Sequence, residues 1–329
     1  MSPRASVVIP AHQRPDLMQV AIRSALDQTF SDTEVIVVDD GSQPSLEPMV
    51  ETFADPRLRY LRLDRNVGEG GTRQAGLDLV TSEHVLFLDD DDVLRPEALR
   101  LLVDALEATP DAVFACGTRV LFDRRGQTLR YPWPRRRLRR GVRDGLLAGF
   151  HIVPSQTMFR SELLRKLGGW RTDIVPAGCD RELLLRHTKH GRPILIPQIV
   201  VDYRIHHRQH SNTTTLSTDR PYLREFTESL PSAENKRAVA CLAAWHHRIE
   251  AETRFQSGDH IASLRLSLKA AASAPFLLLS SLSARQLVWS IVRAATALVL
   301  GPRVAPGMTR LKARLRVALN RDPGGDRRL

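Results

Sequence analysis

Short apolar segments alternate with segments of helical periodicity over residues 5–106, and this alternation restricts the fold more than any other feature. Strands that alternate with helices form a parallel sheet whose two faces the helices cover. The predicted strands are 5–10, 34–42, 58–63 and 83–88, and the predicted helices are 14–30, 68–80 and 95–106. We therefore expect an α/β fold with a mostly parallel sheet.

Acidic side chains follow two of these strands, as the pair Asp39–Asp40 and as the run Asp89–Asp92. Ligands of such sheets bind beyond the carboxyl ends of the strands, so we expect both groups in one cleft. Adjacent carboxylates repel one another and need a counter-charge. Helix capping accounts for one or two of the four. A hard divalent cation, Mg²⁺ or Mn²⁺, accounts for all of them and predicts a nucleotide diphosphate as the ligand.

The net charge of +11 is concentrated in the last third of the chain. Residues 231–329 contain 16 Lys and Arg against 6 Asp and Glu, whereas residues 1–230 contain 32 against 31. This split predicts an α/β domain over residues 1–225 and a basic helical extension over residues 226–329. In the extension, residues 243–276 predict a helical hairpin that turns at Gly258–Asp259.

The apolar segment 274–300 contains Arg285, Gln286 and Arg293, so we do not expect it to span a membrane. It suits a helix on an anionic membrane surface, and equally a helix packed on the α/β domain. With no signal peptide and three dispersed cysteines, we expect a cytoplasmic protein, peripheral on the inner face of the plasma membrane. No nucleic-acid recognition motif is evident, so nucleic acid is not an expected partner.

Three motifs, in this order, resemble those of the family 2 glycosyltransferases of the GT-A fold: SVVIPAHQRP through VVDDGS, NVGEGGTRQAGL and FLDDDDVLRP. The segments GGWRTDIVPAGCDRELLLRHTKHG and YRIHHRQHS extend the resemblance over roughly residues 5–215. It implies a Rossmann-like GT-A sheet and an inverting transfer from a nucleotide-diphosphate sugar, a UDP-sugar, to an acceptor hydroxyl. The implied acceptor is a saccharide or a lipid-linked molecule of envelope polysaccharide, glycolipid or glycoconjugate synthesis.

The resemblance also implies a role for each matching residue. The nucleotide sugar would be bound by Pro10, His12, Arg14, Asp39, Arg73, Asp89 and Asp90. Asp91 and His206 would hold Mn²⁺ or Mg²⁺, with assistance from Asp92. Asp180 would take the proton of the acceptor hydroxyl.

Two alternatives concern the base. The family usually has an acid directly before it, where this chain has Cys179, which we expect to be a small buried thiol. Asp180 could instead cap the helix that follows, and Glu182 is a second acid close by.

Two other functions share parts of this pattern. A nucleotidyltransferase would have a glycine-rich signature after the first strand, and PAHQRP lacks it. A non-catalytic nucleotide-sugar-binding module is supported by Cys179 and opposed by the set Asp91, Asp180 and His206.

Overall fold

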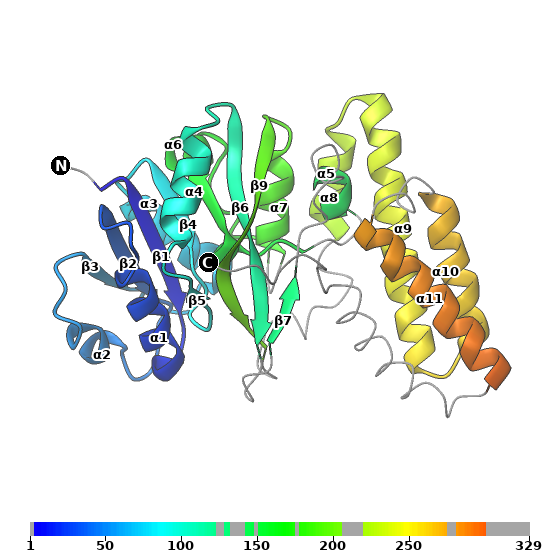
Figure 1. Cartoon of the computed structure of the whole chain (residues 1–329), viewed down its shortest axis with the longest axis horizontal. Helices are drawn as coiled ribbons and strands as arrows, with labels where there is room; N and C mark the ends of the chain where they lie inside the picture. Colours follow the sequence, from blue (N-terminus) through cyan, green and yellow to red (C-terminus); the bar gives the residue numbers. More distant parts are fainter. Residues whose placement is uncertain are drawn as a thin grey trace, which may run out of the picture. The chain divides into compact units, whose positions relative to one another are not determined.

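The computed structural model describes residues 3–122, 128–131, 142–147, 151–174, 178–205, 220–274 and 281–300. The chain forms two compact units, residues 1–133 with 151–226, and residues 134–150 with 227–329 (Figure 1). The predicted domain boundary between residues 225 and 226 stays a prediction.

The first half of the first unit is a parallel sheet with the strand order β3-β2-β1-β4. Its elements are β1 (Ala5–Ala11), α1 (Pro15–Leu26), β2 (Thr33–Asp39), α2 (Glu47–Glu51), β3 (Leu58–Arg62), α3 (Gly68–Leu79) and β4 (His84–Phe87). Ala11 pairs with Asp39, so β1 and β2 end at the same edge of the sheet. The predicted α/β fold is confirmed, and each strand expected from the sequence is present.

The second half continues the sheet with mixed strand directions, to nine strands in the described residues. Its elements are β5 (Val93–Leu94), α4 (Ala98–Glu107), β6 (Ala112–Phe122), β7 (Thr128–Tyr131), the 3₁₀ turn η2 (Pro154–Gln156), β8 (Thr157–Arg160), α6 (Ser161–Lys166), α7 (Cys179–His187) and β9 (Arg192–Arg204). β8 lies antiparallel between β4 and β6, whereas β6 and β9 are parallel. The antiparallel pairs were not expected from the sequence.

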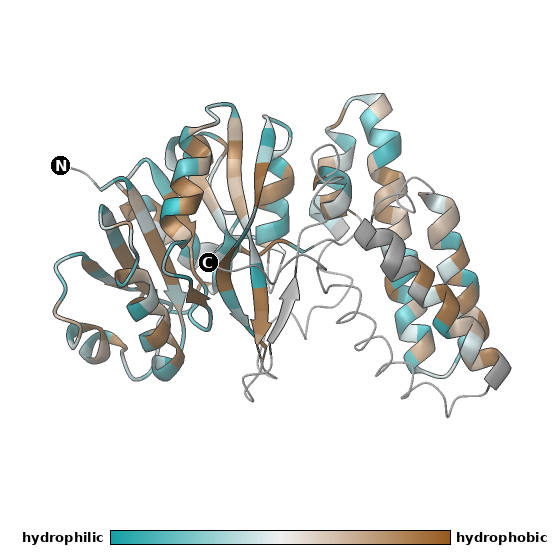
Figure 2. Cartoon of the chain, in the orientation of Figure 1, coloured by the Kyte–Doolittle hydropathy of each residue, from teal (hydrophilic) through white to brown (hydrophobic). Residues whose placement is uncertain are grey.

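Alternate residues of the central strands pack on opposite faces of the sheet, as the two-residue period of a strand requires. Val7 and Ile9 join the apolar core with α1 and α4. Val8 points to the other face, where a Cβ on Gly76 of α3 would lie 2.3 Å from its Cγ1. The apolar colouring of these strands is visible in Figure 2. The close helix packing holds the start of α3 near the ends of β1 and β2.

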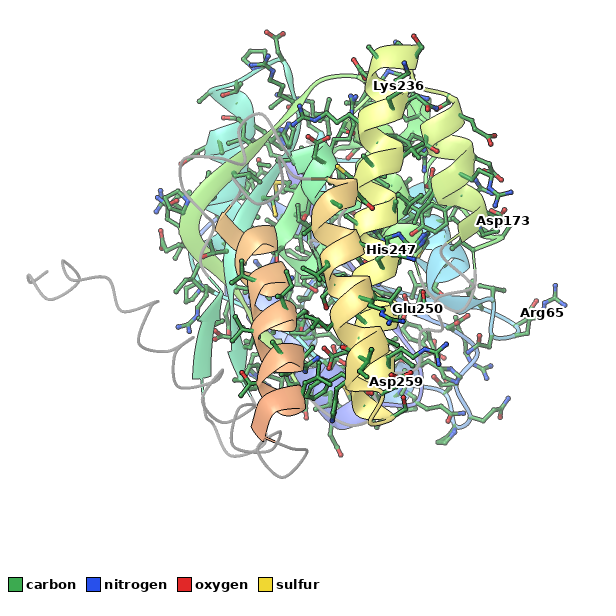
Figure 3. The ribbon with its side chains drawn as sticks, turned by 90° about the vertical axis from the view of Figure 1, so that its right-hand side faces the viewer. Arg65, Asp173, Lys236, His247, Glu250 and Asp259 are labelled. Carbon is green, nitrogen blue, oxygen red and sulfur yellow. The ribbon has the colours of Figure 1, made fainter. Side chains whose placement is uncertain are left out.

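The second unit contains α5 (Val142–Leu147), α9 (Ser232–Gln256), α10 (His260–Ser273) and α11 (Ser281–Leu300), and α8 (Arg220–Glu228) runs into it from the first. The predicted hairpin is confirmed: Gly258 has φ +85°, and Asp259 accepts the Ala262 N–H at 3.0 Å at the start of α10. Figure 3 shows Lys236, His247 and Glu250 along α9, and Asp259 at the turn. Among the described helices, none has the length and apolarity needed to cross a membrane.

Candidate active site

Asp39 ends β2 and is fully buried, with both carboxylate oxygens held by the protein. Oδ1 accepts the Ser42 N–H at 2.9 Å, and Oδ2 accepts the Leu46 N–H at 3.2 Å and the Tyr60 hydroxyl at 2.7 Å. Burial raises the pKa of Asp39, but these hydrogen bonds outweigh it and lower the pKa below its usual value. Asp39 therefore stays ionised and fixes the turn after β2.

Asp40 holds the start of the glycine-rich helix α3. Its carboxylate accepts the backbone N–H groups of Val67 at 2.7 Å and Gly68 at 3.1 Å, where Gly68 has φ +78°. The Nδ1 atom of His12 lies 3.0 Å from the backbone oxygen of Asp40, and Pro10 is half-buried in β1. The ends of β1 and β2 and the start of α3 are thus tied together.

Two arginines contact the aspartate run that follows β4. Arg14 reaches Asp90 through Nη2 at 2.5 Å and Asp91 through Nη1 at 2.8 Å. Arg73 reaches Asp89 through Nη2 at 2.7 Å. Guanidinium groups are therefore the counter-charges that the structure contains.

The two arginines cannot balance four ionised carboxylates, and the carboxyl groups of the run resist ionisation. Burial raises the pKa of Asp89 to about 6 and that of Asp90 to about 8, against the pull of Arg73 and Arg14. Burial and the neighbouring carboxylates also raise the pKa of Asp92 well above its usual range. Its Oδ1 accepts the Arg204 N–H at 3.1 Å, whereas its buried Oδ2 has no hydrogen-bond partner.

This donor set fits a divalent cation. A cation would let these crowded carboxyl groups ionise and would satisfy the unpartnered oxygen of Asp92, and Mg²⁺ is usually held by one or two carboxylates together with substrate phosphates. In the part of the chain that the structure describes, no three His, Cys, Asp or Glu side chains are grouped so as to hold a metal by themselves. His206, the predicted second ligand, lies outside the described residues.

Arg73 connects the acidic run to the helix that carries the predicted base. It is buried, and its Nη1 donates to Glu69 at 3.3 Å and to the Cys179 Sγ at 3.5 Å. Burial lowers the pKa of Arg73, but Asp89 and Glu69 outweigh it and raise the pKa, so the guanidinium stays charged. The side chain of Arg73 therefore links Asp89 to Cys179, the first residue of α7.

The segment that precedes α7 packs tightly on α3. The Trp170 ring lies under Arg73 at 4.9 Å, and the Trp170 N–H donates to Gln74 at 2.8 Å. A Cβ on Gly70 would lie 2.3 Å from the backbone oxygen of Arg171, so only glycine fits there. Trp170 and the glycine before it belong to the GGW motif of the sequence.

Asp180 lies in the first turn of α7, where its side chain is 18% exposed. Its Oδ1 accepts the Arg181 N–H at 2.7 Å, and its Oδ2 lies 3.6 Å from Nε2 of His151. The residue that caps α7 is Gly178, at φ +116°, so Asp180 does not cap the helix.

The two neighbours of Asp180 in the sequence have other contacts. Glu182 accepts from Nε and Nη2 of Arg186 at 2.8 and 2.9 Å, and Arg186 also donates to the backbone oxygen of Gly169. Burial raises the pKa of Cys179 to about 12, with Arg73 opposing, so this buried residue is a neutral thiol. Of the two acids, Asp180 is the one not engaged in an ion pair with an arginine in the structure.

Sequence reasoning missed three side chains of this region. His151 faces Asp180, Ser155 accepts the Asp89 N–H at 3.1 Å, and Arg204 donates to the backbone oxygen of Asp91 at 3.0 Å. Arg204 stands two residues before His206 in the YRIH motif, which was the available signal for it. His151 and Ser155 lie in a segment without a motif, and nothing in the sequence singled them out.

Residues 6–168 match the model of Glycosyl transferase family 2. The fold and this match define the class: residues 6–168 form a family 2 glycosyltransferase domain. It is 39% identical over 106 residues to the succinoglycan biosynthesis protein ExoO of Rhizobium meliloti, covering 32% of this chain and 30% of that protein. It is also 39% identical over 105 residues to a GalNAc(5)-diNAcBac-PP-undecaprenol beta-1,3-glucosyltransferase of Campylobacter jejuni, covering 31% and 34%. The matches thus span about a third of these curated relatives.

Solved structures confirm the fold over most of the chain. S. aureus TarS (residues 1–349) in complex with UDP-GlcNAc has a TM-score of 0.61 at 16% identity and covers 92% of both chains. The mannosyltransferase PcManGT from Pyrobaculum calidifontis, in complex with GDP-Man and Mn²⁺, has a TM-score of 0.58 at 20% identity and covers 98% of this chain and 89% of that one. These proteins share the fold of this chain over about nine tenths of its length or more.

Proposed function

We propose that the protein is an inverting glycosyltransferase that moves a sugar from a nucleoside-diphosphate donor to an acceptor hydroxyl. The observation that carries this proposal is the position of Arg73, which contacts Asp89 at 2.7 Å and Cys179, the neighbour of Asp180, at 3.5 Å. This link between the aspartate run and the residue before Asp180 supports a donor site and a base in one cleft. A single displacement needs these two groups and no covalent intermediate.

The reaction develops positive charge on the anomeric carbon and negative charge on the leaving diphosphate. Asp180 removes the proton of the attacking hydroxyl from the side opposite the leaving group. The carboxylates of Asp39 and Asp40 hold the turn after β2 and the start of α3. His12 contacts the backbone oxygen of Asp40 there, and Pro10, His12 and Arg14 would line the pocket of the nucleotide. A divalent cation, held by Asp91 with Asp92 and His206, would neutralise the diphosphate as a Lewis acid.

The donor we propose is a UDP-sugar. The support comes from TarS, whose structures contain UDP-GlcNAc and UDP, while PcManGT was bound to GDP-Man. The acceptor we propose is a saccharide or a lipid-linked molecule of envelope polysaccharide synthesis. It is supported by relatives named for succinoglycan biosynthesis and for an undecaprenol-linked acceptor. Such an acceptor would place the protein peripherally on the cytoplasmic face of the membrane.

A panel of donors tests the proposal. The full chain is mixed with Mn²⁺ and UDP-GlcNAc, UDP-glucose, UDP-galactose or GDP-mannose, and its melting temperature and the release of free nucleotide are measured. We expect one donor to raise the melting temperature, because a ligand that binds only the folded state stabilises it. We also expect slow nucleotide release that Asp180→Asn abolishes. If a donor raises the melting temperature but no nucleotide is released from any donor, the protein is instead a non-catalytic binding module.

A further inference from the structure

The charge of the second unit is one-sided along a long stretch of sequence. Residues 260–321 contain ten Lys and Arg and no Asp or Glu. Two helices of the structure, α10 and α11, lie within this stretch. The stretch has no carboxylate of its own, and Arg293 of α11 pairs with Glu252 of α9 at 2.6 Å. The excess of the other cations favours an anionic partner.

α10 divides its residues between two opposite faces. Ser263, Ser267 and Ala270 are buried, and Ser263 donates to the backbone oxygen of Ala251 on α9 at 2.7 Å. At 100° per residue, the opposite face contains Ile261, Arg265, Leu268 and Lys269, all exposed. We call these four residues the α10 face.

The α10 face combines exposed apolar side chains with cationic ones. Ile261 is 55% and Leu268 is 51% exposed, the two largest values among the large apolar residues that the structure describes as exposed. They stand two turns apart along the helix with Arg265 and Lys269 beside them. Apolar side chains that enter the headgroup region, flanked by cations that reach the phosphates, are the pattern of a helix lying on an anionic membrane.

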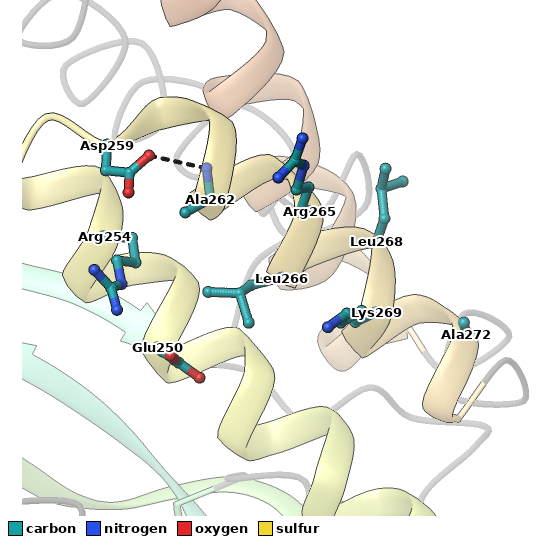
Figure 4. Close-up of a pocket in the computed structure, with 9 residues that line it drawn as sticks. All are labelled: Glu250, Arg254, Asp259, Ala262, Arg265, Leu266, Leu268, Lys269 and Ala272. Carbon is teal, nitrogen blue, oxygen red and sulfur yellow. Dashed lines mark hydrogen bonds between the residues drawn. The ribbon is translucent and has the colours of Figure 1, made fainter.

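A groove between α9 and α10 adjoins this face (Figure 4). It has a volume of about 690 Å³, and Arg254 of α9 faces it together with Arg265 and Lys269. Of the two carboxylates at the groove, Asp259 is engaged in the hydrogen bond to Ala262 N–H drawn in the figure, and Glu250 is exposed. The three cations outnumber the two carboxylates, so the groove has a net positive charge next to Leu268, which suits a phosphate headgroup.

We propose that the α10 face is the surface through which the protein docks on an anionic phospholipid membrane. The inference rests on the proposed function in one respect, because an enzyme with a lipid-linked acceptor has to reach the membrane surface. The charges and exposures that carry it do not depend on the reaction.

Vesicle binding tests the proposal without any donor or acceptor. The full chain is sedimented with vesicles of phosphatidylglycerol and phosphatidylcholine, or of phosphatidylcholine alone, at 50 and 500 mM NaCl. We expect binding to the anionic vesicles at low salt, weakened at least tenfold at high salt, because salt screens exposed charges. Equal binding to both kinds of vesicle, or none, would overturn the proposal.

Paired variants locate the surface. We expect Ile261→Glu with Leu268→Glu, and separately Arg265→Glu with Lys269→Glu, to reduce binding at least fivefold. The matched controls lie on α9, where Val239→Glu replaces a 46% exposed valine and Lys236→Glu an exposed lysine. The controls should bind as the wild type does, and an unchanged melting temperature shows that a variant is folded.

Other outcomes count against the α10 face. If both paired variants bind normally while removal of residues 276–329 releases the protein, the membrane contact lies elsewhere. If Ile261→Glu with Leu268→Glu instead converts a dimer to a monomer in sedimentation velocity and leaves vesicle binding intact, the face is a contact between two copies. A chain that transfers no sugar but still binds through the α10 face would refute the proposed function alone.

Discussion

The Nε2 atom of His151 lies 3.6 Å from the Oδ2 atom of Asp180. The other carboxylate oxygen accepts the Arg181 N–H, so Oδ2 is the atom that a proton would reach. The pKa of His151 is lowered, mainly by partial burial of its half-exposed ring and also by Arg119 and Arg181, whereas Asp180 opposes this shift. A neutral imidazole beside the base can orient the carboxylate and take up its proton.

Replacing the base should separate chemistry from binding. We expect Asp180→Asn to lower kcat by roughly 10²–10⁴, the usual contribution of a general base, while donor affinity stays near the wild-type value. Glu182→Gln is the matched control, because it removes the ion pair with Arg186 and should lower the melting temperature more than kcat. A loss of turnover in Glu182→Gln and not in Asp180→Asn would move the base to Glu182.

The role of His151 can be measured independently. We expect His151→Asn to lower kcat about tenfold without changing the KM for the donor, because the carboxylate loses the group that faces its Oδ2. His151→Gln should recover part of the loss, since its amide nitrogen can stand near the position of Nε2. Wild-type kcat in both variants would show that His151 is only a neighbour of the site.

A divalent cation should be required for turnover. We expect excess EDTA to abolish activity and Mn²⁺ to restore it, because two arginines balance only part of the charge of the aspartate run. Asp91→Asn should weaken both Mn²⁺ binding in calorimetry and donor binding, whereas Asp104→Asn on the exposed side of α4 should change neither. Full turnover in EDTA would refute the cation.

His187 should make the stability of the α/β domain dependent on pH. Burial lowers its pKa to about 4, and its ring packs on Phe159 at 5.2 Å. The unfolded chain binds the proton near pH 6.5, so the stabilisation is complete above that pH and is lost as the pH falls through 6.5 toward 4. The loss amounts to about 3 kcal/mol at most. Urea unfolding between pH 7 and 4 should show this slope in the wild type, and His187→Leu should flatten it.

The strand ends that build the site could be predicted because their signals are local. The apolar segments predict the two buried strands that lead to Asp39 and Asp89. A parallel sheet places the ends of these strands at one edge. The direction of β8 could not be predicted. Its four residues carry no periodicity, and its antiparallel place between β4 and β6 is set by pairing across long stretches of the chain.

The ion pairs of the aspartate run could not be predicted from the sequence either. Arg14 and Arg73 were assigned to the nucleotide because their motifs match the family. Both arginines pair with aspartates of the run. These pairs depend on side-chain geometry between segments far apart in the sequence, and residue spacing does not encode that geometry. His151 was missed for the same reason, since its only link to Asp180 is spatial.

The absent side chain of Gly70 has a consequence for how the site opens. The backbone of Arg171 fills the space a Cβ would take, and the Trp170 N–H is bonded to Gln74 of the same helix. α3 and residues 169–172 are therefore held against each other by close backbone packing and a hydrogen bond, with Arg73 resting on Trp170. At Asp90 and Asp91, by contrast, Arg14 is joined to the aspartate run by side-chain ion pairs, so a change of its rotamer would uncover these carboxylates without moving any backbone.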